Sequence, residues 1–233
     1  MQHTQGMLRF TPILLALLYG VIMYRFSVWR TNRELASQSN ELVDPQLGAL
    51  TNRMADALEL EKIRVHLYEI DPVNGLAAPD GKIYITRGFY RKFTDGEVTA
   101  AELASVVAHE LGHVALGHSR RRMIDFSGQN ALRTALAMIL SRFIPGIGGW
   151  IANFLTTMLA ARLSRGDEYE ADEYAAALLI KSGIGTVPQI SLLSKLEALT
   201  KSCHGAAPAW LMSHPKTPDR IAAIEKIEAD WRK

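Results

Sequence analysis

The hydrophobic pattern begins with an apolar run near the amino terminus, from Phe10 to Tyr24, with an arginine at each end. This run is shorter than the roughly 20 residues that span a bilayer. Because arginine side chains can reach the headgroups, the stretch from Met7 to Trp29 is long enough to cross. A cleaved signal peptide is the alternative, but no small-x-small cleavage site follows the run. Residues 1–30 are therefore predicted to be an uncleaved, single-pass membrane anchor.

The arginines around this run predict its orientation. Arg25, Arg30 and Arg33 follow the run, whereas Arg9 alone precedes it. By the positive-inside rule, the carboxy-terminal domain is expected in the cytoplasm. The rule carries little weight for one short anchor, and a periplasmic domain is the alternative.

Short periodic segments follow the anchor. The polar residues 31–43 predict a linker or a fraying helix, and Asp44-Pro45 has the N-cap and first-turn preferences of a helix reaching about Leu60. Three strands and then a short helix are predicted at 64–70, 76–78, 82–86 and 88–93. Two hairpin turns in series between the strands imply a small antiparallel sheet.

A longer helix is predicted to begin at the capping box Thr99-Ala-Ala-Glu102. Its core-facing residues recur at helical spacing: Leu103, Val107, Leu111 and Val114. Gly112 costs about 1 kcal/mol inside a helix, so we expect another element to pack closely there. With two more helices expected from Pro188 and Pro218, the pattern predicts a mainly helical α+β fold in which residues 31–233 form one domain.

The candidate chemistry centres on Val107-Ala-His-Glu-Leu-Gly-His113, an H-E-x-x-H motif in this helix. A helix turns about 100° per residue, so His109 and His113 share one face and can reach one zinc ion. Glu110 lies beside that face, where it can hold a water molecule and take its proton. The alternative is a solvated helix face with two histidines.

Residues that follow the motif narrow the possible ligands and the possible class of metallopeptidase. His118 lies half a turn from His109 by the same arithmetic, so its expected role is that of a polar residue near the helix end. A metzincin needs Gly three and His six residues after the second histidine, but this sequence has Leu116 and Ser119 there. The metzincin pattern is therefore excluded.

Composition and charge exclude other classes of function. The chain has 233 residues and a net charge of +2 without a concentrated basic patch, so no nucleic-acid partner is expected. Cys203 is the one cysteine, so an intrachain disulfide is excluded and the compartment is left open. No feature of the sequence indicates an oligomeric state.

A third metal ligand can come from the stretch Ser164–Asp172, which we expect to open a helix that stops at Gly183. Glu168 and Asp172 are four residues apart and share a face, whereas Glu170 projects about 200° away. This pair can provide one ligand and one partner that orients a histidine through its second ring nitrogen. An acidic first turn, which is favoured at any helix start, is the alternative.

The segment Ala131–Ala161, between the two halves of this site, is also apolar. A single membrane crossing here would place the third ligand on the wrong side of the membrane from His109. Arg133 and Arg142 leave too short an apolar core for a second crossing. We therefore expect a buried or membrane-surface helical hairpin, with a plain internal helix pair as an equal alternative.

Taken together, these motifs resemble the HtpX and CAAX-prenyl-protease family of membrane-associated gluzincin peptidases. The matching segments occur in order along the chain: Asn74–Pro79, Ile83–Gly88, His109–His113, Glu168–Asp172, and Ser213-His-Pro followed by Arg220-Ile. The resemblance implies a zincin-like metallopeptidase domain with one zinc ion per chain, held by His109, His113 and Glu168. It also implies that Glu110 is the catalytic base and proton shuttle. Only one clear span is present, which excludes a multi-span prenyl-protease barrel.

Several further residues are candidates for roles at this site. An edge strand can pair an extended substrate peptide, and its candidate residues are Gly75, Leu76, Ala77 and Ala78, with an ordinary hairpin as the alternative. His214 lies in the loop before the last helix. It is a candidate catalytic donor to the oxyanion, a ligand that keeps the enzyme latent, or a surface histidine. Arg220 is expected to pair with Asp172 or Glu170.

We therefore expect a membrane-anchored zinc endopeptidase whose substrates, by resemblance, are misfolded or misassembled membrane or envelope proteins. A non-catalytic holdase, with structural zinc and an apolar segment that binds clients, is the first alternative. Three ligands plus Glu110 argue against it, because structural zinc sites usually fill all four positions with protein groups. A membrane-tethered helical adaptor without metal is the second alternative.

Overall fold

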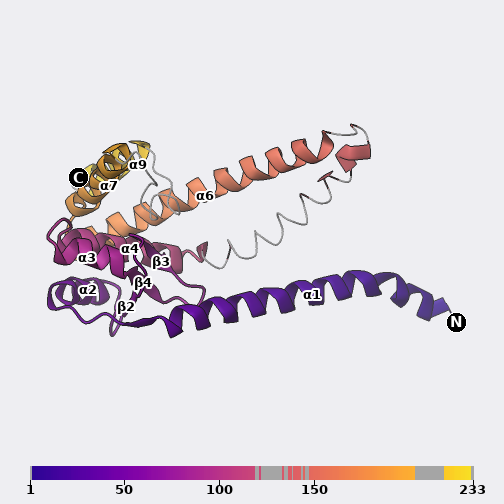
Figure 1. The fold of residues 1–233 in the computed structure, drawn as a ribbon, viewed down its shortest axis with the longest axis horizontal. Helices are drawn as coiled ribbons and strands as arrows, with labels where there is room; N and C mark the ends of the chain where they lie inside the picture. Colours follow the sequence, from indigo (N-terminus) through magenta and orange to yellow (C-terminus); the bar gives the residue numbers. More distant parts are fainter. Residues whose placement is uncertain are drawn as a thin grey trace. The chain divides into compact units, whose positions relative to one another are not determined.

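The computed structural model describes residues 2–118, 147–202 and 218–231, together with scattered positions between 121 and 144. The chain divides into two compact units, one made of Met1–Ser37 and Arg120–Thr156, the other of Gln38–Ser119 and Thr157–Lys233. The first unit contains helix α1 (Gln2–Ser37) and the start of helix α6 (Gly148–Lys181). The second unit contains the sheet, the rest of α6 and the remaining helices (Figure 1).

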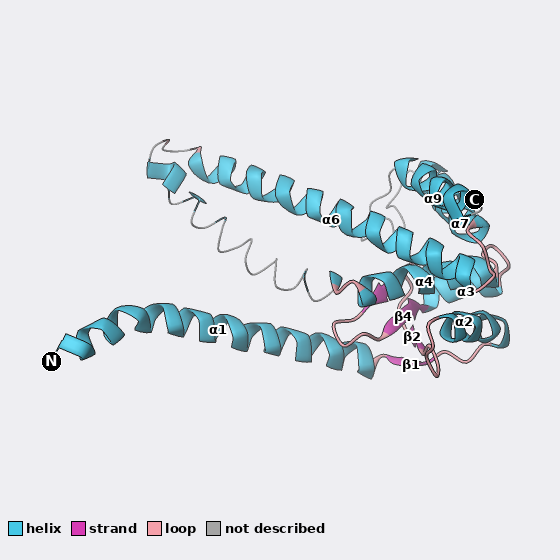
Figure 2. Ribbon diagram, turned by 180° about the vertical axis from the view of Figure 1, so that it is seen from behind, coloured by secondary structure: helices cyan, strands magenta, loops and turns pink. Residues whose placement is uncertain are grey.

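Four short strands form a mixed sheet (Figure 2). Their order is β1 (Ser39–Glu41), β2 (Val65–Tyr68), β4 (Ile83–Thr86) and β3 (Gly75–Ala77). β2 and β4 run parallel, and the other two pairs are antiparallel. The prediction of an antiparallel sheet is therefore wrong for its central pair. The reason is that only the turn between β3 and β4 is a hairpin, whereas the turn after β2 carries the chain past the position that β4 later fills.

The segments beside the sheet follow local sequence signals. Helix α2 (Pro45–Ala57) begins as predicted, because the Asp44 side chain accepts from the backbone N–H groups of Gln46 and Leu47. The short helix α3 (Arg87–Thr94) is also confirmed. The polar stretch 31–43, predicted as a linker or a fraying helix, is helical as far as Ser37, where α1 ends, and then forms β1.

Helix α4 (Ala100–Ala115) lies at the centre of the second unit. It contacts α2, β3, β4 and helix α7 (Val187–Ser202). The predicted capping box is confirmed, since Thr99 and Glu102 exchange side-chain and backbone hydrogen bonds. Leu103 and Val107 are fully buried in the core, whereas Leu111 and Val114 are partly buried, so the first half of the predicted apolar stripe is confirmed as core. This surrounding packing holds α4 as a rigid support for its polar side chains.

Helix α6 is continuous from Gly148 to Lys181, so the predicted start at Ser164 is wrong. The helical pattern simply continues out of the preceding apolar segment. Its acidic residues therefore lie in the helix interior, and a preference for acids in the first turn does not explain them. The predicted end is confirmed, because Gly183 has a φ of 70°. About half of the first arm of the predicted hairpin, 131–147, lies outside the described residues.

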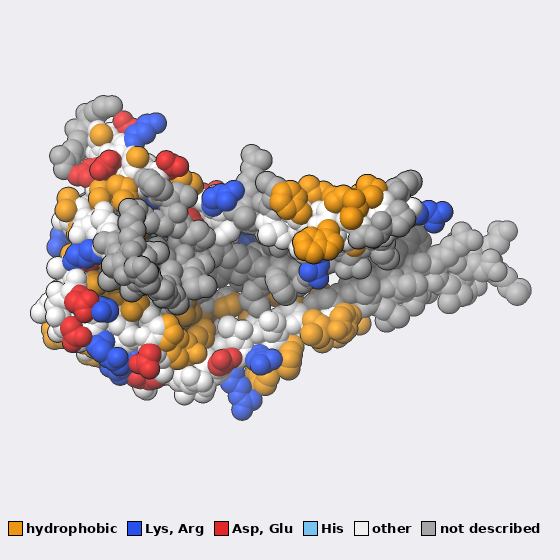
Figure 3. Space-filling view, turned by 45° about the horizontal axis from the view of Figure 1, so that its top comes forward, with side chains coloured by type: hydrophobic (Ala, Val, Ile, Leu, Met, Phe, Trp, Pro, Cys, Tyr) orange, Lys and Arg blue, Asp and Glu red, His pale blue; other side chains and the backbone are white. Residues whose placement is uncertain are grey.

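The first unit exposes many apolar side chains. Those on α1 with large exposure are Leu18, Tyr19, Val21, Ile22, Met23, Phe26 and Trp29. Trp150 and Phe154 are exposed on α6, where apolar side chains gather over its amino-terminal half (Figure 3). Among the described residues, no helix is both long and apolar enough to cross a membrane.

Helices α4 and α6 approach each other closely at Gly112. A Cβ atom built there would lie 3.0 Å from both the Cα and the carbonyl oxygen of Ala171. Backbone atoms in the middle of a helix cannot move aside cheaply, so the contact requires the smallest residue on α4. The close packing predicted from this interior glycine is confirmed.

We predict that Gly112→Ala lowers the free energy of unfolding by about 1–3 kcal/mol, since the overpacking outweighs the gain in helix propensity. Gly48→Ala is the matched control, because Gly48 lies within α2 with open space around its Cβ position. That control is expected to be neutral or to stabilise by up to about 1 kcal/mol. Urea denaturation of the purified chain measures both, and equal effects would contradict the prediction.

Glu102 also ties α4 to α7. Its carboxylate accepts from Ser191 at 2.6 Å and from Lys195 at 2.8 Å, in addition to the Thr99 backbone. Burial alone would raise the pKa of Glu102, but these hydrogen bonds outweigh it and hold the pKa below the ordinary value of 4.5. The ionised form is therefore the one that the fold stabilises.

We predict that Glu102→Gln, which keeps a capping side chain, lowers the free energy of unfolding by about 1 kcal/mol at neutral pH. Because the folded pKa is lowered, this difference is present above 4.5 and disappears as the pH falls through the folded value. Urea denaturation at a series of pH values measures it. Glu97→Gln removes an exposed ion pair with Lys92 and should change stability by less than about 0.5 kcal/mol. A Glu102→Gln difference that persists unchanged in acid would refute the argument.

Candidate metal centre

Two imidazoles from one helix form the first half of the site. His109 and His113 lie one turn apart on α4, and both are buried. Their Nε2 atoms are 3.1 Å apart, and the rings meet edge to face at 87°. The spacing of the motif therefore brings two ring nitrogens to one point, beside the apolar core.

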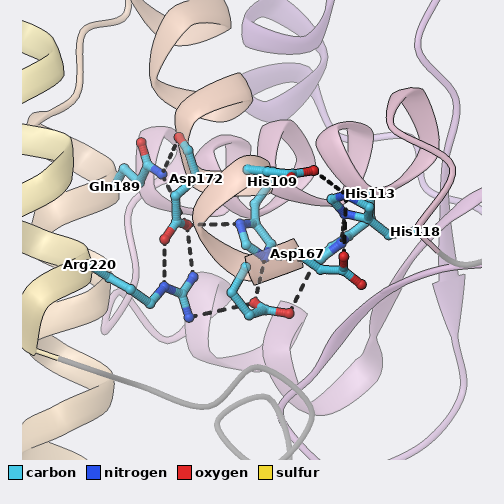
Figure 4. Close-up of polar contacts among 9 residues, drawn as sticks. His109, His113, His118, Asp167, Asp172, Gln189 and Arg220 are labelled. Carbon is cyan, nitrogen blue, oxygen red and sulfur yellow. Dashed lines mark hydrogen bonds and ion pairs between the residues drawn. The ribbon is translucent and has the colours of Figure 1, made fainter. Parts of the chain in front are cut away.

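Helix α6 adds carboxylates on the other side of that point. Glu168 is buried, and its two oxygens lie 3.3 Å from His109 Nε2 and 3.5 Å from His113 Nε2. One turn further, Asp172 Oδ1 lies 3.0 Å from the second ring nitrogen of His109 (Figure 4). Glu170 faces elsewhere, with an oxygen 3.1 Å from His118. Glu168 and Asp172 therefore lie on the side of α6 that contacts the motif histidines, and Glu170 lies on another side, as helical periodicity predicts.

Arg220, on helix α9 (Pro218–Trp231), clamps Asp172. Its Nε donates to Oδ2 at 2.5 Å and its Nη2 to Oδ1 at 2.8 Å, and both residues are buried. Of the two partners expected for Arg220, the structure therefore has Asp172. Burial alone would raise the pKa of Asp172, but the hydrogen bonds from Arg220 and His109 outweigh it and lower the pKa.

This pairing determines the tautomer of His109. An ionised Asp172 can only accept, and its Oδ1 lies 3.0 Å from His109 Nδ1, so this contact favours the tautomer of His109 with the proton on Nδ1. The lone pair of a neutral ring is then on Nε2, which faces His113 and Glu168. A metal ligand requires that lone pair, and a carboxylate behind the ring is the usual partner of a metal-binding histidine.

The three groups fit a divalent cation. Among the described residues, His109, His113 and Glu168 form the one group whose possible ligand atoms all lie within 4.8 Å of one another. Two imidazoles and a carboxylate are a donor set typical of zinc. In addition, four buried carboxyl groups lie in and around the cluster, those of Glu110, Asp167, Glu168 and Asp172, together with the buried guanidinium of Arg220. A divalent cation would offset part of this excess of acidic groups.

His118 is the neighbour that sequence reasoning missed. It is fully buried, and its Nδ1 lies 2.9 Å from His113 Nδ1 (Figure 4). Helix α4 ends at Ala115 with Leu116 as its C-cap, and Gly117 follows with a φ of 71°, so the chain turns back and His118 returns toward His113. The assumption of a continuous helix placed it on the opposite face. A glycine directly before it was the available signal.

Glu110 follows His109 on α4 and lies against strand β3. It is buried, and a Cβ built on Gly75 would lie 3.5 Å from its Oε1 and 2.7 Å from Val106 Cγ1. Gly75, Leu76 and Ala77 form β3 at the edge of the sheet, and Ala78 follows in the turn. The absence of a side chain at Gly75 therefore lets this strand pass directly over the Glu110 carboxylate. His214 lies outside the described residues.

Comparison with known proteins agrees with the resemblance seen in the motifs. The chain is 29% identical to the metalloprotease LoiP of Escherichia coli, over 79% of this chain and 71% of LoiP. It is 26% identical to the protease HtpX homolog of Salinibacter ruber, over 92% and 88% of the two chains. The beta-barrel assembly-enhancing protease of Yersinia pestis is also 26% identical, over 82% of this chain and 40% of that protein. The model of Peptidase family M48 matches residues 41–228, so the chain belongs to this family and is a zinc metalloprotease.

Proposed function

We propose that His109, His113 and Glu168 hold the zinc ion of this metalloprotease and that Glu110 is its catalytic base. The observation that carries the proposal is the convergence of the three buried ligand groups beside Glu110. Zinc, when bound, polarises the peptide carbonyl and lowers the pKa of water toward about 7. Glu110 accepts a proton from the attacking water and returns it to the leaving amine. Asp172 and Arg220 orient His109.

The substrate is proposed to bind as an extended peptide along β3. This strand is the outer strand of the sheet, and an added peptide can pair with such a strand through its backbone. The residues that would contact it are Gly75, Leu76, Ala77 and Ala78. The passage of Gly75 over Glu110 supports this assignment, because a peptide on β3 then lies near the proposed base.

A non-catalytic holdase is the competing function. A structural zinc site would fill all four positions with protein groups, whereas the described residues provide three clustered ligands. Hydrolysis requires a base that accepts a proton from water. Glu110, which follows His109 in sequence and is buried beside β3, can be this base. The endopeptidase is therefore favoured.

The proposed substrates are misfolded or misassembled membrane or envelope proteins, so the proposed role is protein quality control. The name of one relative, the beta-barrel assembly-enhancing protease, supports this substrate class. This substrate class also fits the proposed location at a membrane. We propose that residues 1–30 form a single-pass anchor, on the basis of the apolar run and the exposed apolar side chains of α1. The positive-inside rule favours a cytoplasmic catalytic domain.

We predict that Glu110→Gln retains one zinc ion per chain but loses casein cleavage by at least about 100-fold, since general base catalysis contributes roughly 10²–10⁴. Glu168→Ala is expected to lose both zinc and activity, because the cluster is left with two ligands. Metal analysis and a casein assay on the same samples measure both quantities. If Glu110→Gln cleaves casein as fast as the parent, the catalytic assignment is wrong.

We predict that the parent chain stays in the membrane fraction after alkaline carbonate extraction. A double substitution, Leu14→Glu with Leu17→Glu, should release it, because a charge near the centre of a span costs about 2.5–3.5 kcal/mol. Leu14→Ile with Leu17→Ile is the matched control and should remain bound. Carbonate release of the parent would contradict the anchor. Digestion of the domain by protease added to spheroplasts would contradict the cytoplasmic orientation.

A further inference from the structure

We infer that His118 and Glu170 form an outer hydrogen-bond chain that holds His113 in the tautomer required for metal binding. The inference rests on the proposed ligand role of His113. It assigns to His118 a positioning role, because its ring contacts His113 rather than the substrate or the metal.

The chain of contacts is continuous and largely buried. His118 Nδ1 lies 2.9 Å from His113 Nδ1, and on its other side His118 Nε2 lies 3.1 Å from Glu170 Oε2. The His118 ring is fully buried, whereas the Glu170 side chain is 56% exposed. Asp167 is also near, but its Oδ1 is 3.8 Å from His118 Nε2, beyond hydrogen-bond distance. Glu170 is therefore the acceptor that ends the chain.

These contacts determine where the protons lie. A carboxylate only accepts, so the proton of His118 is on Nε2, directed at Glu170. The Nδ1 of a neutral His118 is then an acceptor, and the hydrogen bond at that atom must come from Nδ1–H of His113. His113 therefore has its lone pair on Nε2, the atom that faces His109 and Glu168. This is the tautomer that a metal ligand needs.

One helix thus supplies the outer partners of both imidazoles. Asp172 of α6 contacts His109 directly, and Glu170, two residues earlier, acts on His113 through His118. The two arms differ, because the Asp172 arm is buried and clamped by Arg220, whereas the Glu170 arm ends at the surface. In the second arm, the neutral ring of His118 lies between His113 and the Glu170 carboxylate. The arm is longer, but it still favours the proton of His113 on Nδ1.

A packing role for His118 is the alternative, and the two roles make different demands. Packing requires the volume of the side chain, whereas orientation requires an acceptor atom opposite His113 Nδ1. Asn places its amide oxygen near the position of a histidine Nδ1, whereas Leu fills similar space without an acceptor. The pair His118→Asn and His118→Leu therefore separates the two roles.

The test measures the zinc dissociation constant of the full chain by competition with a chelator. We expect His118→Leu to weaken zinc binding by about 10–100-fold, the usual effect of losing an outer partner of a metal ligand. His118→Asn should recover most of this loss. Long-range ¹H–¹⁵N spectra of the zinc-loaded chain should show the Nδ1–H form of His113 in the parent and in His118→Asn.

Glu170 and a matched neighbour complete the experiment. Glu170→Leu should weaken zinc binding in the same direction as His118→Leu, and Glu170→Gln, which keeps an acceptor oxygen, should weaken it less. Glu173→Gln, at an exposed position of α6, is the control and should leave zinc affinity unchanged. Circular dichroism verifies that each variant is folded.

Equal zinc affinity of folded His118→Leu and the parent would overturn the inference. So would equal losses in His118→Leu and His118→Asn, because the acceptor would then be irrelevant. If the expected order of affinities holds in a parent chain that cleaves nothing, the inference is supported and the proposed endopeptidase function fails. The two proposals can therefore fail separately.

Discussion

The site depends on the close packing of α4 against α6 at Gly112 and Ala171. Gly112 precedes the second motif histidine by one residue, and Ala171 precedes Asp172 by one. Where these two small residues meet, helix backbones come near enough for short side chains to bridge them. A carboxylate of α6 then reaches the imidazoles of α4 without distortion. The H-E-x-x-H motif supplies the nitrogens, but the glycine within it makes the approach of the third group possible.

A third helix makes this arrangement electrostatically acceptable. Without Arg220, Asp172 would be a buried carboxylate with only the His109 imidazole and the Gln189 amide as polar neighbours among the described residues, at a cost of several kcal/mol. The guanidinium lies 3.6 Å from Glu168 as well, so it balances charge on Glu168 in addition to Asp172. The carboxy-terminal helix α9 is therefore part of the centre, although it contributes no candidate metal ligand. Arg220 also acts on His109 indirectly. It keeps Asp172 ionised, and the ionised Asp172 favours the proton of His109 on Nδ1, the ring nitrogen that faces away from the metal centre.

Features with helical periodicity were predictable from the sequence, and those that depend on a chain reversal were not. The faces of Glu168, Glu170 and Asp172 follow from 100° per residue, whether the helix begins at Gly148 or at Ser164. His118 fails this arithmetic, because Gly117 ends the helix in a left-handed conformation and returns the chain. The start of α6 was missed because an acidic stretch inside a long helix has the same local composition as a first turn. In both cases the local sequence was compatible with two structures, and the packing of the folded chain determined which one formed.

The parallel pairing of β2 with β4 has a direct consequence for the site. Two hairpins in series would give the order β2-β3-β4, in which β3 has a neighbour on each side and cannot accept a further strand. The predictions of an antiparallel sheet and of an edge strand at 75–78 therefore conflict with each other. The observed order, β1-β2-β4-β3, resolves the conflict, because β4 fills the inner position and leaves β3 outermost. Since Gly75 of that outer strand lies against Glu110, the same topology brings the proposed peptide-binding edge beside the proposed base.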